Sequence, residues 1–233
     1  MKHIRILILL FLAISCGLAA AGPIDISKFS APVRVACIGD SITQGSGTSS
    51  GNSYPAQLQR LLGKQWEVGN FGVCRCTALR KGDFPYWNET ALTNAQQFRP
   101  DVVVILLGAN DTKPQNWRFH GEFSKDYADL VRIFLAATNT PVVFVCRPTS
   151  VPGTGNYGIN EAAVEQEISI IDRIASQLKL GVIDLHAALD GKPQLLPDRV
   201  HPNNDGAAEL AKAAFRVLTG NEPHVPVKSP STP

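Results

Sequence analysis

The chain of 233 residues lacks the features of several functional classes. Its net charge at pH 7 is only +2 and it has no run of basic residues, so the charge does not favour binding to nucleic acid or to an anionic membrane. No glycine-rich phosphate loop follows its first apolar segment after the N-terminus, which argues against a nucleotide-binding protein. No cysteines and histidines have the spacing of a zinc site, and we predict no metal and no cofactor.

Cysteine is also sparse, with five in the chain, four of them beyond the N-terminal segment. Those four allow three disulfide pairings, and the sequence does not choose among them. Cys37 and Cys146 lie in apolar segments, where a buried free thiol is the commoner outcome. Cys74 and Cys76 are too close in the chain for an easy disulfide with each other.

The N-terminal segment differs from the rest of the chain. Its first five residues include three basic side chains, residues 6–16 are almost wholly apolar, and alanines at 19–21 offer a cleavage site. This layout predicts a secretory signal peptide over residues 1–21, a secreted or periplasmic protein, and no stable membrane insertion once the segment is removed. An uncleaved anchor and lipidation of Cys16 are the alternatives, although the residues before Cys16 match a lipidation motif poorly.

The remaining composition is that of an ordinary globular domain, with 44% hydrophobic and 18% charged residues, which we assign to residues 22–220. The tail at 221–233 contains four prolines and is expected to be flexible. Apolar runs predict strands, and 3.6-residue periodicity and capping signals predict helices. The strands are expected at 33–38, 66–71, 101–107, 141–146 and 181–185, and the helices at 54–62, 91–98, 123–138, 162–178 and 203–218.

This alternation of strands and helices predicts an α/β fold, a three-layer α/β/α sandwich around a five-stranded parallel sheet. Ligands of such folds bind at the carboxyl ends of the strands. Ser41, Gly72, Asn110 and the segment 198–201 all follow expected strands. We therefore expect them to meet at one edge of the sheet.

The polar residues at this edge include a set suited to nucleophilic catalysis. Ser41 is a weak nucleophile until a base removes its proton, and His201 is a suitable base because imidazole titrates near neutral pH. Asp198 precedes His201 by three residues, so its carboxylate can reach the imidazole and fix its tautomer. Each residue alone has an ordinary structural explanation, and the hypothesis depends on their combination.

Four blocks in this order resemble the SGNH (GDSL-type) hydrolases over residues 33–218: Gly-Asp-Ser-Ile-Thr at Ser41, Asn-Phe-Gly-Val at Gly72, Gly-Ala-Asn-Asp at Asn110, and Asp-Arg-Val-His-Pro at His201. The resemblance implies a flavodoxin-like fold and esterase or lipase activity without the Gly-x-Ser-x-Gly elbow, which this chain also lacks. It further implies an oxyanion hole made by the backbone N–H groups of Ser41 and Gly72 and the amide of Asn110. Two cysteines within 73–77 depart from the family pattern and put the shape of that loop in doubt.

The run around Trp117 looks like that of the carbohydrate-acetylesterase branch, so an acetylated sugar or polysaccharide is the expected substrate. Aromatic and amide side chains at 86–87 and 116–117 suit a sugar-binding rim. Asp40, Trp117 and Arg147 are the candidate substrate contacts.

Two other classes remain open. One is a lysophospholipase, thioesterase or lipase of the same fold. The other is a non-catalytic glycan-binding or nucleotide-binding protein. The oligomeric state cannot be inferred from the sequence.

Overall fold

The computed structural model describes residues 21–153 and 155–223. The predicted signal peptide therefore lies outside the described residues except for its last position, and so does most of the proline-rich tail. Cys16 also falls outside them. The predictions for these segments, including the boundaries of the domain and the export of the protein, stay predictions.

The described chain folds around a single sheet of five parallel strands in the order β2-β1-β3-β4-β5. The strands are β1 (Val33–Gly39), β2 (Trp66–Gly72), β3 (Val102–Leu106), β4 (Val142–Arg147) and β5 (Gly181–Asp184). Gly39, at the end of β1, is in register with Gly72 of β2 and Leu106 of β3. The three strands therefore end at the same level, and the loops that follow them start side by side.

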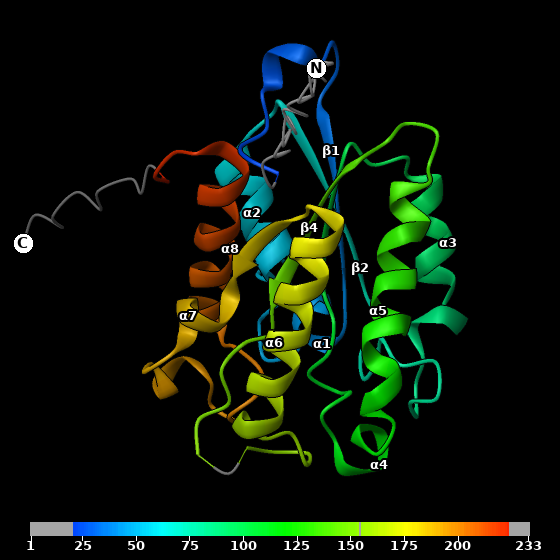
Figure 1. Ribbon diagram of the computed structural model, residues 1–233. Helices are drawn as coiled ribbons and strands as arrows, with labels where there is room; N and C mark the ends of the chain where they lie inside the picture. Colours follow the sequence, from blue (N-terminus) through cyan, green and yellow to red (C-terminus); the bar gives the residue numbers. More distant parts are fainter. Residues whose placement is uncertain (1–20, 154, 224–233) are drawn as a thin grey trace, which may run out of the picture.

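Helices cover both faces of the sheet (Figure 1), which confirms the predicted three-layer α/β/α sandwich. One face packs against α3 (Thr90–Gln97), α5 (His120–Leu135) and α6 (Glu161–Leu178). The other packs against α2 (Tyr54–Leu62), α7 (Leu185–Leu189) and α8 (Asn204–Thr219). The remaining short elements are α1 (Ser41–Gln44), α4 (Pro114–Trp117), and the 3₁₀ helices η1 (Ile26–Lys28), η2 (Tyr86–Asn88) and η3 (Pro193–Leu195).

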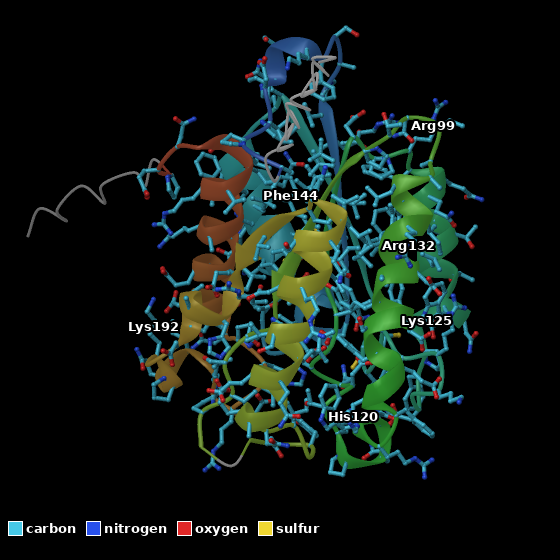
Figure 2. The ribbon with its side chains drawn as sticks, in the orientation of Figure 1. Arg99, His120, Lys125, Arg132, Phe144 and Lys192 are labelled. Carbon is cyan, nitrogen blue, oxygen red and sulfur yellow. The ribbon has the colours of Figure 1, made fainter. Side chains whose placement is uncertain are left out.

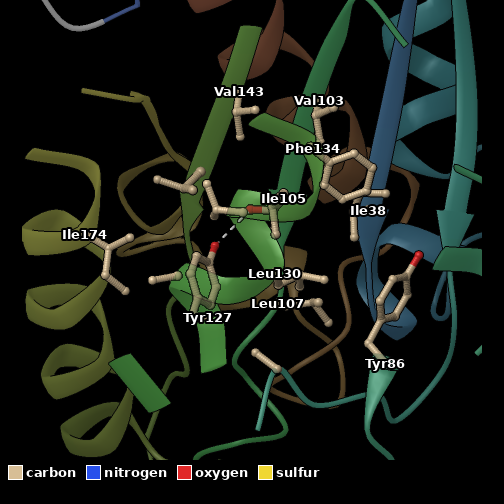
Figure 3. Close-up of a cluster of buried hydrophobic side chains, with 14 of the residues drawn as sticks. Ile38, Tyr86, Val103, Ile105, Leu107, Tyr127, Leu130, Phe134, Val143 and Ile174 are labelled. Carbon is tan, nitrogen blue, oxygen red and sulfur yellow. Dashed lines mark hydrogen bonds between the residues drawn. The ribbon is translucent and has the colours of Figure 1, made fainter. Parts of the chain in front are cut away.

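The central strand β3 shows why this sheet needs two helical layers. All five of its residues are buried, and successive side chains point to opposite faces, as in any strand. Val103 and Ile105 join the cluster under α5, where Tyr127 donates a hydrogen bond of 3.4 Å from its hydroxyl to the carbonyl of Ile105 (Figure 3). Val104 joins the cluster under α8. A strand that is apolar on both faces belongs in the middle of the sheet, as predicted.

The main elements agree with the sequence predictions to within three residues at each end, whereas α1, α4 and α7 were not expected. Each of these three helices has only four or five residues, too few for a periodic pattern to show. Of the helices in the described part of the chain, none is both long enough and apolar enough to span a membrane. Cys37, Cys76 and Cys146 are buried and Cys74 is exposed, and all four are free thiols.

Candidate active site

Ser41 is held at the end of β1 by a short capped helix. Asp40 is the N-cap of α1, and its carboxylate accepts a hydrogen bond of 2.9 Å from the backbone N–H of Ile42. Ser41 is therefore the first residue of α1, and its backbone N–H has no partner within the helix. Gly39 is required here because a Cβ would collide with the side chain of Thr43. This turn brings a nearly buried serine to the carboxyl edge of the sheet.

Ser41 is the first member of a chain of hydrogen bonds with the segment 198–201. Its hydroxyl lies 2.9 Å from Nε2 of His201, 160 positions away in the sequence. Nδ1 of His201 lies 2.7 Å from Oδ2 of Asp198, and the backbone N–H groups of His201 and Val200 donate to Oδ1 of Asp198 at 2.7 and 3.0 Å. Burial raises the pKa of Asp198, but these hydrogen bonds together outweigh it and hold the pKa below its ordinary value. Asp198 is therefore an ionised acceptor that orients the imidazole.

Two neighbouring features hold His201 in place. Asn203, two residues further on, caps α8 and accepts a hydrogen bond of 2.9 Å from the N–H of Gly206. On the other side, Gly47 has a left-handed φ of 86°, and a Cβ there would lie 2.7 Å from the carbonyl oxygen of Pro202 and 3.0 Å from Cβ of His201. The loop after α1 thus packs closely on the residue that Ser41 contacts.

Asn110 joins the loops that follow β2 and β3. Its side-chain amide donates to Oδ2 of Asp40 and to the carbonyl of Cys76, both at 3.2 Å. The next residue, Asp111, accepts hydrogen bonds from the backbone N–H groups of Ala78 and Leu79 at 3.0 and 2.7 Å. Both N–H groups of the Asn110 amide therefore have acceptors. Donation to a substrate oxyanion requires that one of these long bonds be exchanged.

The structure corrects the prediction for Gly72. Its backbone N–H donates to Oδ1 of Asn70 at 2.9 Å, and Gly72 is not among the residues that line the cavity at Ser41. The residue of this loop that does line the cavity is Arg75, in a left-handed conformation with φ of 72°. Within the described residues, no acceptor lies within hydrogen-bond distance of its backbone N–H. Gly72 instead packs against α1, since an added Cβ would lie 2.7 Å from the carbonyl carbon of Thr43.

The cavity at Ser41 has a volume of about 500 Å³, in the range of small-molecule sites. It lies at the carboxyl ends of β1, β2 and β3, as predicted. Sequence reasoning identified only four of its lining residues: Asp40, Ser41, Asn110 and His201. It missed the others: Ile42, Cys74, Arg75, Asp83, Ala109, Lys113, Gln115, Tyr157, Ile159 and Val200.

Tyr157 is a cavity residue that its surroundings in the sequence could have identified. It stands among Gly153, Gly155 and Gly158 between β4 and α6, and a tyrosine in such a loop is a candidate for contact with a ligand. The structure places its ring 5.7 Å from the ring of His201, edge to face, and leaves 58% of the residue exposed.

Two predicted substrate contacts lie elsewhere. Trp117 is half-buried and packs against α5, with its ring 5.9 Å from that of Phe123. Arg147 forms ion pairs with Asp172 at 2.9 Å and with Asp184 at 2.6 Å. Neither lines the cavity at Ser41. The hydrogen bonds of Arg147 to these carboxylates outweigh its burial and raise its pKa further, so its charge is already used within the protein.

The predicted aromatic and amide rim is likewise packed into the protein. Tyr86 is fully buried and donates from its hydroxyl to the carbonyl of Phe71 at 2.6 Å. The indole N–H of Trp87 donates to the carbonyl of Ala78 at 2.8 Å. Asn116 is 1% exposed, and its amide joins Asp83 to the carbonyl of Asn110, each at 2.9 Å. These side chains support the loops around the cavity rather than its surface.

A buried carboxyl group that sequence reasoning missed lies behind Asn110. Glu167 of α6 is fully buried, and neither of its oxygens has a hydrogen-bond partner among the described residues. It packs on the backbone of Gly108, where an added Cβ would overlap the carboxyl group. Burial raises the pKa of Glu167 well above its ordinary value, and repulsion from the Asp111 carboxylate adds to the shift. Both effects favour the protonated, neutral form of the group.

Asp40 is a second buried acid. Burial raises its pKa to about 6, against the lowering effect of its hydrogen bond from Ile42 and of the charges of His201 and Lys113. In the described part of the chain, no three His, Cys, Asp or Glu side chains are grouped so as to hold a metal ion.

Comparison with known proteins agrees with this geometry. Residues 37–209 match the GDSL-like lipase/acylhydrolase family. The chain is 40% identical over 202 residues to an acetylxylan esterase from Xylanibacter ruminicola, an alignment that covers 77% of this chain and 42% of that protein. The chain thus spans less than half the length of this relative.

Solved structures show the same fold. A carbohydrate acetylesterase from Sinorhizobium meliloti superposes with a TM-score of 0.65 at 21% identity, covering 78% of this chain and 96% of that one. A putative arylesterase from Agrobacterium tumefaciens gives a TM-score of 0.65 at 20% identity with the same coverage. The family match and the 40% identity establish that the chain belongs to the GDSL-like lipase/acylhydrolase family, a family of carboxylic ester hydrolases.

Proposed function

We propose that the protein is a serine esterase that removes O-acetyl groups from carbohydrates. The observation that carries this proposal is the hydrogen-bonded series Ser41–His201–Asp198 at a cavity of about 500 Å³. A serine hydroxyl, a base 2.9 Å away and an ionised group orienting that base form the arrangement needed for acyl transfer.

In the first step, Oγ of Ser41 attacks the carbonyl carbon of the ester while Nε2 of His201 takes its proton. Asp198 stabilises the imidazolium that forms, because its carboxylate accepts the N–H at Nδ1. The tetrahedral intermediate collapses by breaking the bond to the sugar oxygen, which receives the proton from His201. An acyl ester remains on Ser41. A water molecule that gives its proton to His201 then releases acetate and restores the free serine.

Three donors are suited to stabilise the oxyanion of the intermediate. Among the described residues, neither the backbone N–H of Ser41, at the start of α1, nor that of Arg75 donates a hydrogen bond. The Asn110 amide is the third donor after it leaves Asp40 or Cys76. In this proposal Arg75 takes the role that sequence reasoning gave to Gly72. One such donor typically contributes about 10² to 10³ in turnover.

The carbohydrate substrate is supported by the 40% identity to an acetylxylan esterase, since the structural neighbours near 20% identity support the fold alone. We also propose that the enzyme acts outside the cytoplasm, because residues 1–21 have the layout of a signal peptide. A substrate in the plant or microbial cell wall is consistent with export. The same site could act on lipid or thioester substrates, so the acyl chain must be tested directly.

The first experiment compares the wild type with Ser41→Ala on 4-nitrophenyl acetate and with a fluorophosphonate label. We expect the wild type to hydrolyse the ester and to be labelled on Ser41, and the variant to do neither while keeping its fold. Turnover by Ser41→Ala close to that of the wild type would refute the assignment. Failure of the wild type to react with both reagents would favour a glycan-binding protein.

The second experiment measures acetate release from acetylated xylans and other acetylated sugars, beside a series of 4-nitrophenyl esters from acetate to long acyl chains. The proposal expects the highest kcat/KM for acetate and measurable release from at least one polysaccharide. A preference for long acyl chains would replace the carbohydrate substrate with a lipid.

A further inference from the structure

Two cations at the cavity have no carboxylate partner within the described part of the protein. Lys113, in the turn after β3, is 8% exposed and lines the cavity, yet its ammonium forms no ion pair or hydrogen bond with a described side chain. Other lysines of the described chain do have partners, as Lys81 does with Glu122, Lys125 with Asp129, and Lys212 with Glu209. Lys113 is therefore a nearly buried cavity residue whose charge has no partner among the described side chains.

Arg75 is the second cation. Its guanidinium stacks on the ring of Phe84, 3.8 Å from the centroid, and it has no carboxylate within ion-pair distance among the described residues. Stacking fixes the plane of the guanidinium at the rim, which reduces the entropy that is lost when it binds a ligand. Both cations border the same cavity as Ser41 and His201.

The acidic groups at the cavity do not neutralise these cations by direct contact. Asp83 accepts hydrogen bonds from the side-chain amides of Asn116 at 2.9 Å and Gln115 at 3.3 Å. Asp40 accepts from Ile42 and Asn110, and lies beyond ion-pair distance from Lys113. The carboxylates of Asp40 and Asp83 thus accept hydrogen bonds from backbone and side-chain amides. The side chains of Lys113 and Arg75 have no carboxylate acceptor among the described residues.

Lys113 is nearly buried as a residue, but its ammonium is not among the buried polar atoms that lack a partner, so the ammonium stays accessible to a ligand in the cavity that Lys113 lines. We propose that Lys113 and Arg75 bind a carboxylate of the substrate, so that the preferred ester is an acetyl group on or beside a uronic acid residue of an acidic glycan. This inference rests on the proposed function, since it names the class of glycan that the same site takes. The carboxylate satisfies both cations while the acetyl carbonyl lies at Ser41.

The competing explanation is that Lys113 serves the enzyme internally by stabilising the ionised form of Asp40. The charge of Lys113 is one of the influences that lower the pKa of Asp40. In that case its removal affects every ester alike. A carboxylate-binding role instead changes the preference between two substrates that differ only in that carboxylate, and this difference decides between the explanations.

The experiment uses an acetylated glucuronoxylan oligosaccharide and the same oligosaccharide with its uronic carboxyl converted to a neutral amide. Acetate release gives kcat/KM for each, and the ratio of acid to amide is the measured preference. Charged hydrogen bonds typically change such ratios by about 10-fold to 100-fold. We expect a wild-type ratio of at least tenfold, and a ratio close to one in the double variant Lys113→Met/Arg75→Met. Added salt should lower the wild-type ratio.

Lys125→Met is the matched control. It removes one lysine charge from α5 (Lys125 is labelled in Figure 2), where the side chain pairs with Asp129 and does not line the cavity. Its ratio should equal that of the wild type.

A wild-type ratio near one, or equal losses on both substrates in the double variant, would overturn the inference and leave the esterase assignment intact. No hydrolysis of either oligosaccharide or of 4-nitrophenyl acetate would instead refute the proposed function.

Discussion

Replacing Gly72 by alanine tests how closely β2 and the helix that carries Ser41 are packed. A Cβ at position 72 would lie 2.7 Å from the carbonyl carbon of Thr43, 2.9 Å from the carbonyl oxygen of Asp40, and closer still to the amide nitrogen of Gln44. All three atoms belong to the backbone of α1 or its cap, so no side chain can rotate away. The end of β2 and α1 must therefore separate.

The size of this shift follows from contact distances. Carbon atoms in ordinary contact lie about 3.5 Å apart, so the two segments must move apart by roughly 1 Å. The same shift applied to Oγ of Ser41 would lengthen its 2.9 Å contact with His201 beyond hydrogen-bonding range. Misplacement of a catalytic group by about 1 Å reduces rates by on the order of 10²-fold. The cost in stability should be about 1 to 3 kcal/mol, which leaves a folded protein.

The measurement is kcat/KM for 4-nitrophenyl acetate, with thermal unfolding as the test of folding. Gly121→Ala is the control, because its Cβ would have no neighbour within 4 Å, on the outer part of α5. We expect Gly72→Ala to lose about 10² in kcat/KM, and Gly121→Ala to match the wild type. If Gly72→Ala stayed folded and within threefold of the wild type, the argument from close packing would be wrong.

Three further predictions concern the buried carboxyl group of Glu167, the orientation of His201 by Asp198, and Arg147. Because burial raises the pKa of Glu167, the folded state keeps a proton that the unfolded state loses above about pH 4.5, and stability falls as pH rises towards the folded pKa. Above about pH 4.5, stability should therefore fall less steeply with rising pH in Glu167→Gln than in the wild type, by up to about 1.4 kcal/mol per pH unit. The exposed control Glu165→Gln should keep the wild-type slope, and an unchanged slope in Glu167→Gln contradicts the reasoning. Asp198→Asn should lower kcat by about 10³ to 10⁴ without unfolding the protein, because the carboxylate that orients His201 is lost; a loss under tenfold excludes that role. Arg147→Met should leave kcat/KM within about twofold and reduce stability by under about 1 kcal/mol, since its ion pairs are partly exposed; a tenfold loss of kcat/KM would restore it as a substrate contact.

The fold could be predicted because its information is local. An apolar run such as that of β3 predicts that a strand forms and that both of its faces are buried. The capping signals of α8, with Asn203 at its start and Gly220 at its end, fix the bounds of a helix to within a residue. The short helix α1 was missed because four residues cannot show a period.

The site could be predicted only in part, because its remaining members depend on contacts between loops. Ser41, Asp198 and His201 stand in motifs, and the structure brings them together. Gly72 also stands in a motif, but its N–H is taken by Asn70, two residues away, and only the three-dimensional turn reveals this. Trp117 and Arg147 were chosen by residue type, which does not tell a cavity from a helix interface or an ion pair.

The buried carboxyl groups behind the site explain why residue type misled. Asp40, Asp111 and Glu167 are all essentially inaccessible to solvent, and a rule based on polarity places such residues on the surface. Asp40 accepts a hydrogen bond from the backbone of α1, and Asp111 accepts two from the backbone of the loop after β2, so their burial is compensated by hydrogen bonds. Glu167 has no such compensation and presses on Gly108, two residues before Asn110. Burying the unpartnered Glu167 carboxyl group lowers stability. Proteins keep such destabilising side chains mainly at functional sites, which fits its place behind the candidate oxyanion donor Asn110.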